Sequence, residues 1–209
     1  MNVLNAEQNT LLYLVRHGET DWNAANRFQG QADIPLNGRG HSQGAALARY
    51  FAGQPIRRVY SSDLQRAKDT ASYISMAKGL TTEVLPELRE ISFGSWEGMT
   101  RSEIGKQYPA QVRLWREDPS KLAVPGAEAY PVAQERLCRT IKRLVAANCG
   151  NNIVVVSHGG AIRLLLAGLL EMSLTGIWHF TLESAGINQL VFYPEGRVVL
   201  KRLNQIVWE

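Results

Sequence analysis

The sequence contains little cysteine and no long apolar run. Its two cysteines, Cys138 and Cys149, fall in one stretch with a helical pattern, and about eleven residues of helix span about 16 Å, which is too far for a disulfide. Reduced thiols are typical of cytoplasmic proteins, so we expect a cytoplasmic chain. No apolar run approaches the ~18 residues that a membrane-spanning helix needs, and residues 1–10 lack the pattern of a signal peptide. We therefore expect no membrane partner.

Positive charge is in slight excess but is not concentrated in the sequence. The 209 residues include 23 Lys and Arg against 19 Asp and Glu, and no basic run is longer than Arg57-Arg58. A nucleic-acid binder usually shows a basic face with interleaved aromatic residues, so we expect no nucleic-acid partner. The mild excess can still attract small anionic substrates. The length fits one domain over residues 1–209, with residues 1–10 as a polar tail.

Two buried-strand patterns end in a histidine followed by glycine. They are residues 11–18 (LLYLVRHG) and residues 153–160 (IVVVSHGG). Strand and helix patterns alternate along the chain, which favours an α/β fold: a three-layer sandwich with a mostly parallel central sheet and helices on both faces. Ligands bind at the carboxyl ends of such strands. If the two strands are neighbours, His17 and His158 face one another there.

The remaining patterns surround this sheet with helices and loops. Residues 19–35 lack periodicity and are expected to form a loop over the pocket, and residues 92–125 a lid-like insertion. Asp63 is expected to cap a helix, since its carboxylate can accept from the amides of a first turn. Val132 is expected on the inner side of a helix over 131–147. The other expected helices are 42–51, 63–76, 101–108, 110–117 and 161–170, and the other expected strands are 59–61, 82–85, 187–193 and 198–203.

The two strand-end histidines favour chemistry over a structural role. A lone histidine after an apolar strand is usually structural, but His17 and His158 occupy equivalent places. Neither has a second His or a Cys at ligand spacing, so we expect no metal. Arg16 can grip a phosphate or carboxylate through two N–H groups, or pair with an internal carboxylate. Arg66, in the first turn after another strand, can bind the same anion or lie in solvent.

Such a cationic pocket suits a tetrahedral oxyanion. Nearby positive charge lowers the pKa of a histidine, which keeps the ring neutral and nucleophilic near pH 7. A carboxyl group must handle the leaving-group proton, and spacing does not choose among Glu19, Glu87, Glu90 and Glu97. Aromatic and apolar residues either shape a pocket for an organic leaving group or pack under a loop: Trp22, Phe28, Trp96, Met99 and Trp115.

Six segments, in order over nearly the whole chain, resemble the histidine phosphatase superfamily, which contains cofactor-dependent phosphoglycerate mutases and small-molecule phosphatases. They are RHGETDWN (16–23), FQG (28–30), SSDLQRAKDTA (61–71), LREISFGSWEG (88–98), PGAEAY (125–130) and VSHGG (156–160). RHG alone is a weak signal, but the full set is specific.

The resemblance implies a division of labour without cofactor or metal. His17 would be the nucleophile that becomes phosphohistidine, and Glu90 the proton donor. The phosphoryl oxygens would be held by Arg16, Arg66, His158, Asn23 and the Gly159 amide, while Gln29 and Gly30 would touch the substrate. Ala127 and Ala129 stand where related enzymes with a PGGES-like segment carry Gly and Ser, so the detail of the lid is left open.

The spacing of the arginines favours a phosphatase over a mutase. Mutases of this family carry an insertion after the catalytic glutamate with extra arginines, whereas the interval 99–124 is short and Arg101, Arg113 and Arg116 are spread out. The segments FQGQAD and LREISFGSWEG are most similar to α-ribazole phosphatases of cobalamin synthesis and to broad-specificity relatives.

We therefore expect hydrolysis of a small phosphate monoester, α-ribazole 5'-phosphate or a sugar phosphate, with cofactor-dependent phosphoglycerate mutase as the alternative. The expected partner is this small phosphorylated substrate, and a homodimer is allowed. A phosphate-binding protein without chemistry is a minor alternative, because the chain has candidates for both nucleophile and acid.

Overall fold

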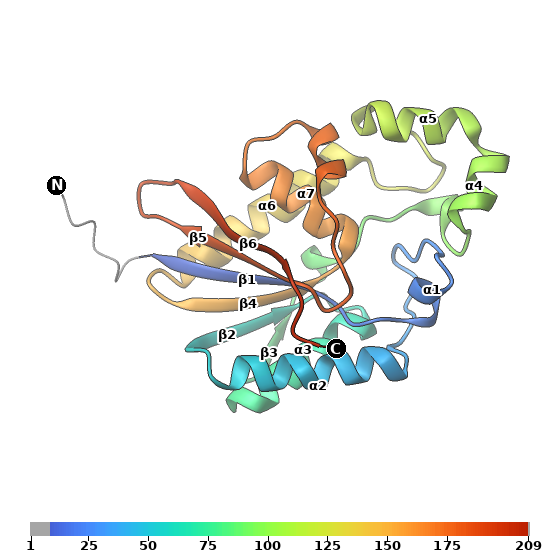
Figure 1. The fold of residues 1–209 in the computed structure, drawn as a ribbon. Helices are drawn as coiled ribbons and strands as arrows, with labels where there is room; N and C mark the ends of the chain where they lie inside the picture. The colour runs from blue at the N-terminus through green and yellow to red at the C-terminus, as the bar shows by residue number, and fades with distance from the viewer. Residues whose placement is uncertain (1–8, 209) are drawn as a thin grey trace.

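A six-stranded sheet runs through the middle of the computed structural model, which describes residues 9–208 (Figure 1). The strand order is β3-β2-β4-β1-β5-β6. The first four of these strands are mutually parallel, β5 is antiparallel to β1, and β6 is antiparallel to β5. The expected mostly parallel sheet is confirmed. The strands are β1 (Thr10–Arg16), β2 (Ile56–Ser61), β3 (Thr82–Val84), β4 (Asn152–Ser157), β5 (Ile187–Phe192) and β6 (Val198–Gln205).

Alternating side chains of the central strands fill two separate cores. Leu12 and Leu14 of β1 belong to the core under α6 and α7, and Tyr13 and Val15 belong to the core under α2 and α3. Figure 1 shows these two helix pairs on opposite faces of the sheet, which confirms the three-layer sandwich. The helices are α1 (Asp21–Ala24), α2 (Gly38–Ala52), α3 (Gln65–Lys78), α4 (Arg101–Gln107), α5 (Pro109–Glu117), α6 (Tyr130–Ala147) and α7 (Gly159–Leu169).

The two histidine strands are hydrogen-bonded neighbours. β1 and β4 pair in parallel, with Arg16 opposite Ser157 at their carboxyl ends. The backbone N–H of His17 then donates to the carbonyl of Ser157 at 2.9 Å. Because the two strands end at the same level of the sheet, His17 and His158 leave it side by side, as expected.

Helices α4 and α5 lie beyond the carboxyl end of the sheet (Figure 1). Helix α4 begins with a capping box, in which Thr100 accepts from the Glu103 N–H and the Glu103 carboxylate accepts from the Thr100 N–H. The fully buried Trp96 contacts Trp115 of α5, with ring centroids 5.8 Å apart. Aromatic packing therefore attaches these two helices to the core.

Two expectations about side-chain placement are wrong. Asp63 does not cap a helix: α3 begins at Gln65 without a side-chain cap. The Asp63 carboxylate instead accepts from Arg89 Nε at 2.7 Å, a pairing between segments distant in sequence. Val132 is 58% exposed, because the buried stripe of α6 follows Ala133 and Leu137 along the other side of the helix.

Two expectations about segment boundaries also need correction. The segment 19–35 contains the short helix α1, which begins with a capping box between Thr20 and Asn23. Thr10 is the first residue of β1 and is buried, so it does not belong to a polar tail. Residues 1–8 of the expected tail lie outside the described residues.

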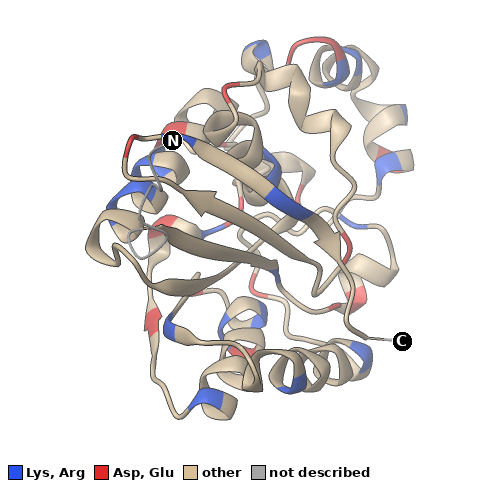
Figure 2. Ribbon diagram, turned by 60° about the vertical axis from the view of Figure 1, so that its left-hand side comes forward, with Lys and Arg blue, Asp and Glu red and all other residues tan. Residues whose placement is uncertain are grey.

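Charged residues are distributed over the outer layers (Figure 2). Lys and Arg lie on helices on both sides of the sheet and on the edge strand β6, interspersed with Asp and Glu. Within residues 9–208, no helix combines the length and the hydropathy of a membrane span.

Candidate active site

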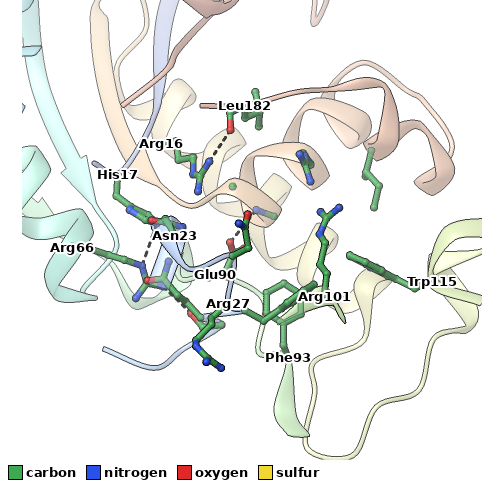
Figure 3. A pocket seen from close by; sticks show the side chains of 18 of the residues that line it. Arg16, His17, Asn23, Arg27, Arg66, Glu90, Phe93, Arg101, Trp115 and Leu182 are labelled. Atoms are coloured by element: carbon green, nitrogen blue, oxygen red, sulfur yellow. Dashed lines mark hydrogen bonds between the residues drawn. The ribbon is translucent and has the colours of Figure 1, made fainter. Parts of the chain in front are cut away.

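A pocket of about 340 Å³ opens at the carboxyl ends of β1 and β4 (Figure 3). Every predicted site residue except His158 lines it. These lining residues are Arg16, His17, Asn23, Gln29, Gly30, Arg66, Glu90 and Gly159. His158 lies directly behind them, fully buried, with its ring centroid 5.1 Å from that of His17. The residues predicted to act together are therefore gathered in one place.

The His17 ring is held in one orientation by its own neighbour. Nδ1 of His17 lies 2.6 Å from the carbonyl oxygen of Gly18. A carbonyl can only accept, so Nδ1 carries the proton and Nε2 has the free lone pair. Nε2 accepts a hydrogen bond from Arg66 Nε at 3.2 Å, which agrees with this tautomer. The lone pair on Nε2 of His17 therefore points toward Arg66.

Burial makes this histidine neutral. Burial, followed by the charges of Arg66 and Arg16, lowers the pKa of His17 well below its usual 6.5, and the contact with Gly18 opposes the shift only in part. Burial and the charge of Arg66 likewise lower the pKa of His158. Both rings are therefore uncharged near pH 7.

Arg66 is fully buried, and among the described residues no carboxylate lies within ion-pair distance of it. Its two terminal nitrogens donate to backbone carbonyls, Nη1 to Ala32 at 2.7 Å and Nη2 to Gly30 at 2.8 Å. Burial lowers the pKa of Arg66 to about 10, so the side chain keeps its charge at pH 7. The loop carbonyls orient this charge without neutralising it.

Several buried donors around His17 have no hydrogen-bond partner among the described residues. Arg16 donates from Nη1 to the carbonyl of Leu182 at 2.7 Å, but its Nε is buried and unpartnered. Both ring nitrogens of His158 are also buried without a partner. An unsatisfied buried donor costs about 1–3 kcal/mol. A bound oxyanion would accept from these donors and remove this cost, so the arrangement suits an anion.

Glu90 is the one of the four carboxylate candidates that lines the pocket. Its Oε1 accepts from the backbone N–H groups of Ile91 and Ala161, at 3.0 and 2.7 Å, and its Oε2 accepts from that of Gly160 at 2.9 Å. The carboxylate is thereby fixed against the first turn of α7. Oε2 keeps a free lone pair with which to carry a proton or contact a water molecule.

The apolar candidates divide between pocket and core. Phe28 and Trp115 line the pocket, whereas Trp96 is fully buried beneath it, and neither Trp22 nor Met99 is part of the lining. Within residues 9–208, no three His, Cys, Asp or Glu side chains cluster closely enough to hold a metal ion.

Some lining residues were not identified from the sequence. They are Asn26, Arg27, Phe93, Arg101, Tyr130, Gly160, Arg163, Ile177, Trp178 and Leu182. Arg163 had a readable signal, since it is a charged residue in an otherwise apolar helix, five residues after His158. The others reach the pocket through loop and helix packing that no local pattern specifies.

Over most of its length the chain is similar to one known family of proteins. Residues 12–205 match the family model "Histidine phosphatase superfamily (branch 1)". The adenosylcobalamin/alpha-ribazole phosphatase of Salmonella typhimurium is 34% identical over 94% of this chain and 98% of its own length. Phosphoserine phosphatase 1 of Hydrogenobacter thermophilus is 34% identical over 92% of this chain and 91% of its own.

A solved structure of a phosphatase is also similar to this chain. The mycobacterial glucosyl-3-phosphoglycerate phosphatase in complex with VO3 superimposes with a TM-score of 0.85 at 31% identity, over 93% of this chain and 98% of that one. The family model spans most of the sequence, and these named relatives are small-molecule phosphatases. The chain therefore belongs to the histidine phosphatase superfamily.

Proposed function

We propose that the chain hydrolyses a small phosphate monoester through a phosphohistidine formed on Nε2 of His17. The observation that carries this proposal is the geometry of His17: its Nδ1 faces the Gly18 carbonyl, and its Nε2 lone pair points to Arg66, which has no carboxylate within ion-pair distance among the described residues. The lowered pKa of His17 agrees with a neutral ring. Neutral imidazole is a nucleophile, and fixed donors stabilise the charge that develops on phosphoryl oxygens.

In the first step, Nε2 of His17 attacks phosphorus in line with the ester oxygen. A P–N bond forms while the P–O bond breaks, and the departing oxygen takes a proton from Glu90. Arg16 Nε, which has no partner among the described residues, donates to the phosphoryl oxygens, joined by Asn23 and the Gly159 amide, and these three residues line the pocket. A ring N–H of His158, which lies directly behind His17, is the further donor that we propose. Arg66 Nε transfers its hydrogen bond from the histidine to the phosphate, which frees the lone pair.

In the second step, water replaces the alcohol. The Glu90 carboxylate, now ionised, takes a proton from a water molecule whose oxygen attacks phosphorus. The P–N bond breaks, its electron pair returns to Nε2 of His17, and inorganic phosphate leaves. The protons balance because Glu90 loses one to the alcohol and regains one from water.

The substrate class follows from the relatives and from the lining. The named relatives act on small phosphorylated compounds, and a pocket of about 340 Å³ accommodates a leaving group such as α-ribazole or a sugar. Of the three arginines considered for a mutase, Arg101 lines the pocket, and Arg113 and Arg116 are not part of the lining. This arrangement favours hydrolysis over mutase chemistry. The cytoplasmic location and the homodimer stay predictions from the sequence.

The test is to trap the intermediate. His17→Ala should reduce hydrolysis of p-nitrophenyl phosphate by at least about 1,000-fold, because the reaction then lacks its nucleophile. Wild-type protein mixed with labelled substrate and quenched in alkali should carry acid-labile phosphate, and the variant should not. Circular dichroism controls for folding. Undiminished turnover in a folded His17→Ala variant would refute the assignment.

A further inference from the structure

The pocket extends beyond Glu90, away from the nucleophile. Figure 3 shows Arg101 and Trp115 on the opposite side of Glu90 from His17. Arg163 and Tyr130 also belong to the lining, and the proposed reaction uses neither. This outer part of the pocket is rich in positive charge for a region that performs no chemistry.

Arg163 is the first unexplained charge. It lies on α7, half-buried, where its Nε donates to the carbonyl of Phe180 at 3.1 Å. Among the described residues its terminal nitrogens have no hydrogen-bond partner, and no carboxylate lies within ion-pair distance. Burial, followed by the charge of Arg101, lowers the pKa of Arg163. Burying an unpaired cation is costly unless an anion joins it.

Arg101 and Tyr130 complete the group. The Arg101 guanidinium lies over the Trp115 ring, 5.6 Å from its centroid, and has no carboxylate within ion-pair distance among the described residues. Trp115 Nε1 donates to the Tyr130 hydroxyl oxygen at 2.6 Å. The hydroxyl proton of Tyr130 is left to donate, and no acceptor for it is present in the described residues. Two guanidinium groups and one hydroxyl therefore offer donors to the same space.

The position of Glu90 indicates what enters that space. A general acid must contact the ester oxygen that departs, so the carbon part of the substrate would extend past Glu90, away from His17. Figure 3 shows Arg101 and Trp115 on that side of Glu90. We propose that Arg163, Arg101 and Tyr130 bind a second anionic group carried by the leaving group. Preferred substrates are then monoesters that also bear a carboxylate or a second phosphate. Trp115 and Trp178, whose rings meet edge to face, would contact the short carbon chain between the two anions.

This inference rests on the proposed phosphatase activity, and matched substrate pairs separate the two. The first pair is 3-phosphoglycerate and glycerol 1-phosphate, which differ by a carboxylate in place of a hydroxymethyl group. The second pair is fructose 1,6-bisphosphate and fructose 6-phosphate, which differ by a second phosphate. The readout is the ratio of kcat/KM within each pair, since a ratio cancels general damage to the enzyme.

In at least one pair, the wild-type kcat/KM should be roughly 10- to 100-fold higher for the substrate that carries the second anionic group. This factor corresponds to one charge-assisted hydrogen bond. The pair with the larger ratio identifies the second anion. Arg163→Gln and Arg101→Gln should each reduce that ratio at least about tenfold, mainly through KM, and Arg163→Lys should recover part of it. Arg101 is exposed, so its variant tests the proposal even if Arg163→Gln folds poorly. Arg139→Gln is the matched control, because Arg139 is exposed on α6 outside the pocket lining.

The same ratios can be measured without turnover. Calorimetric dissociation constants of the His17→Ala variant for both pairs should show the same preference. Ratios near one in both pairs, or a wild-type ratio in Arg163→Gln and Arg101→Gln, would overturn the second-anion site. Such results with phosphohistidine still formed would leave the phosphatase proposal intact. Failure to form phosphohistidine, with a clear binding preference, would instead reject the reaction and keep the site.

Discussion

The backbone conformation of Gly30 determines where its carbonyl group lies, and this carbonyl contacts the charged side chain of Arg66. Its φ is +52°, and a Cβ atom there would overlap the Glu97 carboxylate. That carboxylate accepts from the backbone N–H groups of Gln31 and Phe93, at 3.1 and 3.0 Å. The Gly30 carbonyl in turn accepts from Arg66. Glu97, although outside the lining, therefore holds the loop that orients the guanidinium beside His17.

Gly30→Ala should reduce kcat/KM by at least about tenfold. A left-handed conformation costs a residue with a side chain about 1–2 kcal/mol, and the added Cβ also displaces the loop from Arg66. The measurement is steady-state hydrolysis of p-nitrophenyl phosphate. Gly38→Ala is the matched control, because a Cβ at Gly38 meets nothing within 4 Å. Equal activity of the two variants would contradict this role of the loop.

The buried histidines predict a pH dependence of stability. The folded-state pKa values of His17 and His158 are lowered, whereas the unfolded chain titrates near 6.5. Below pH 6.5 the unfolded state therefore binds protons that the folded state does not, and the free energy of unfolding falls as the pH falls. Each histidine contributes up to about 1.4 kcal/mol per pH unit, so the two together approach ~2.7.

Urea denaturation at several pH values between 5 and 8, in buffers without phosphate or sulfate, measures this slope. The free energy should be nearly flat above pH 7 and should decline between pH 6.5 and 5, above the range of ordinary carboxylates. His17→Gln should show a shallower decline. A flat curve down to pH 5 would mean that these rings are not neutral in the folded protein.

At the scale of residues, the sequence predicted which side chains meet at the pocket, but not the contacts that hold them there. His17 and His158 were identified because each ends an apolar strand, which is a local pattern. Glu90 could be separated from Glu97 only by family resemblance, since both lie on one irregular segment and only packing decides which carboxylate reaches the pocket.

At the scale of elements, helix α6 has one buried face and one exposed face. Leu137 is fully buried, and Val132 is 58% exposed on the same helix. Leu137→Ala should lower the free energy of unfolding by about 2–5 kcal/mol, because it leaves a cavity under the sheet. Val132→Ala should change it by less than about 0.5 kcal/mol. Urea denaturation compares the two, and similar losses would mean that the helix packs the other way round.

The elements themselves were largely predictable, and their ends were not. β1 and β4 carry unbroken apolar runs that only a doubly covered sheet explains. Helix α1 was missed because it is only four residues long, although Thr20 and Asn23 carried a capping signal. The Asp63 prediction was wrong because Arg89, from a distant segment, takes the carboxylate. Long-range pairings of this kind leave no local trace.

At the scale of the whole molecule, the buried donors around His17 that have no partner among the described residues predict that a bound anion stabilises the fold. A ligand that binds only the folded state raises the free energy of unfolding, by about 2.7 kcal/mol at a concentration of 100 times Kd. Inorganic phosphate should therefore raise Tm in a concentration-dependent manner at pH 7.5. Chloride at matched ionic strength is the control. Arg66→Met should lose most of the phosphate effect, and an equal effect of chloride would exclude specific binding.

Residues far along the chain complete the surroundings of β1 at the pocket. Leu182 accepts from Arg16 across 166 positions of sequence, and Asn188 of β5 donates to the carbonyl of Leu14 across 174. Both partners of β1 in the sheet, β4 and β5, follow it by well over a hundred residues. During synthesis His17, the proposed nucleophile, therefore emerges well before the strands that flank β1. A nascent chain that still holds β5 inside the ribosomal tunnel lacks both of these contacts to β1, so we expect the proposed dephosphorylation to begin only after β5 has emerged.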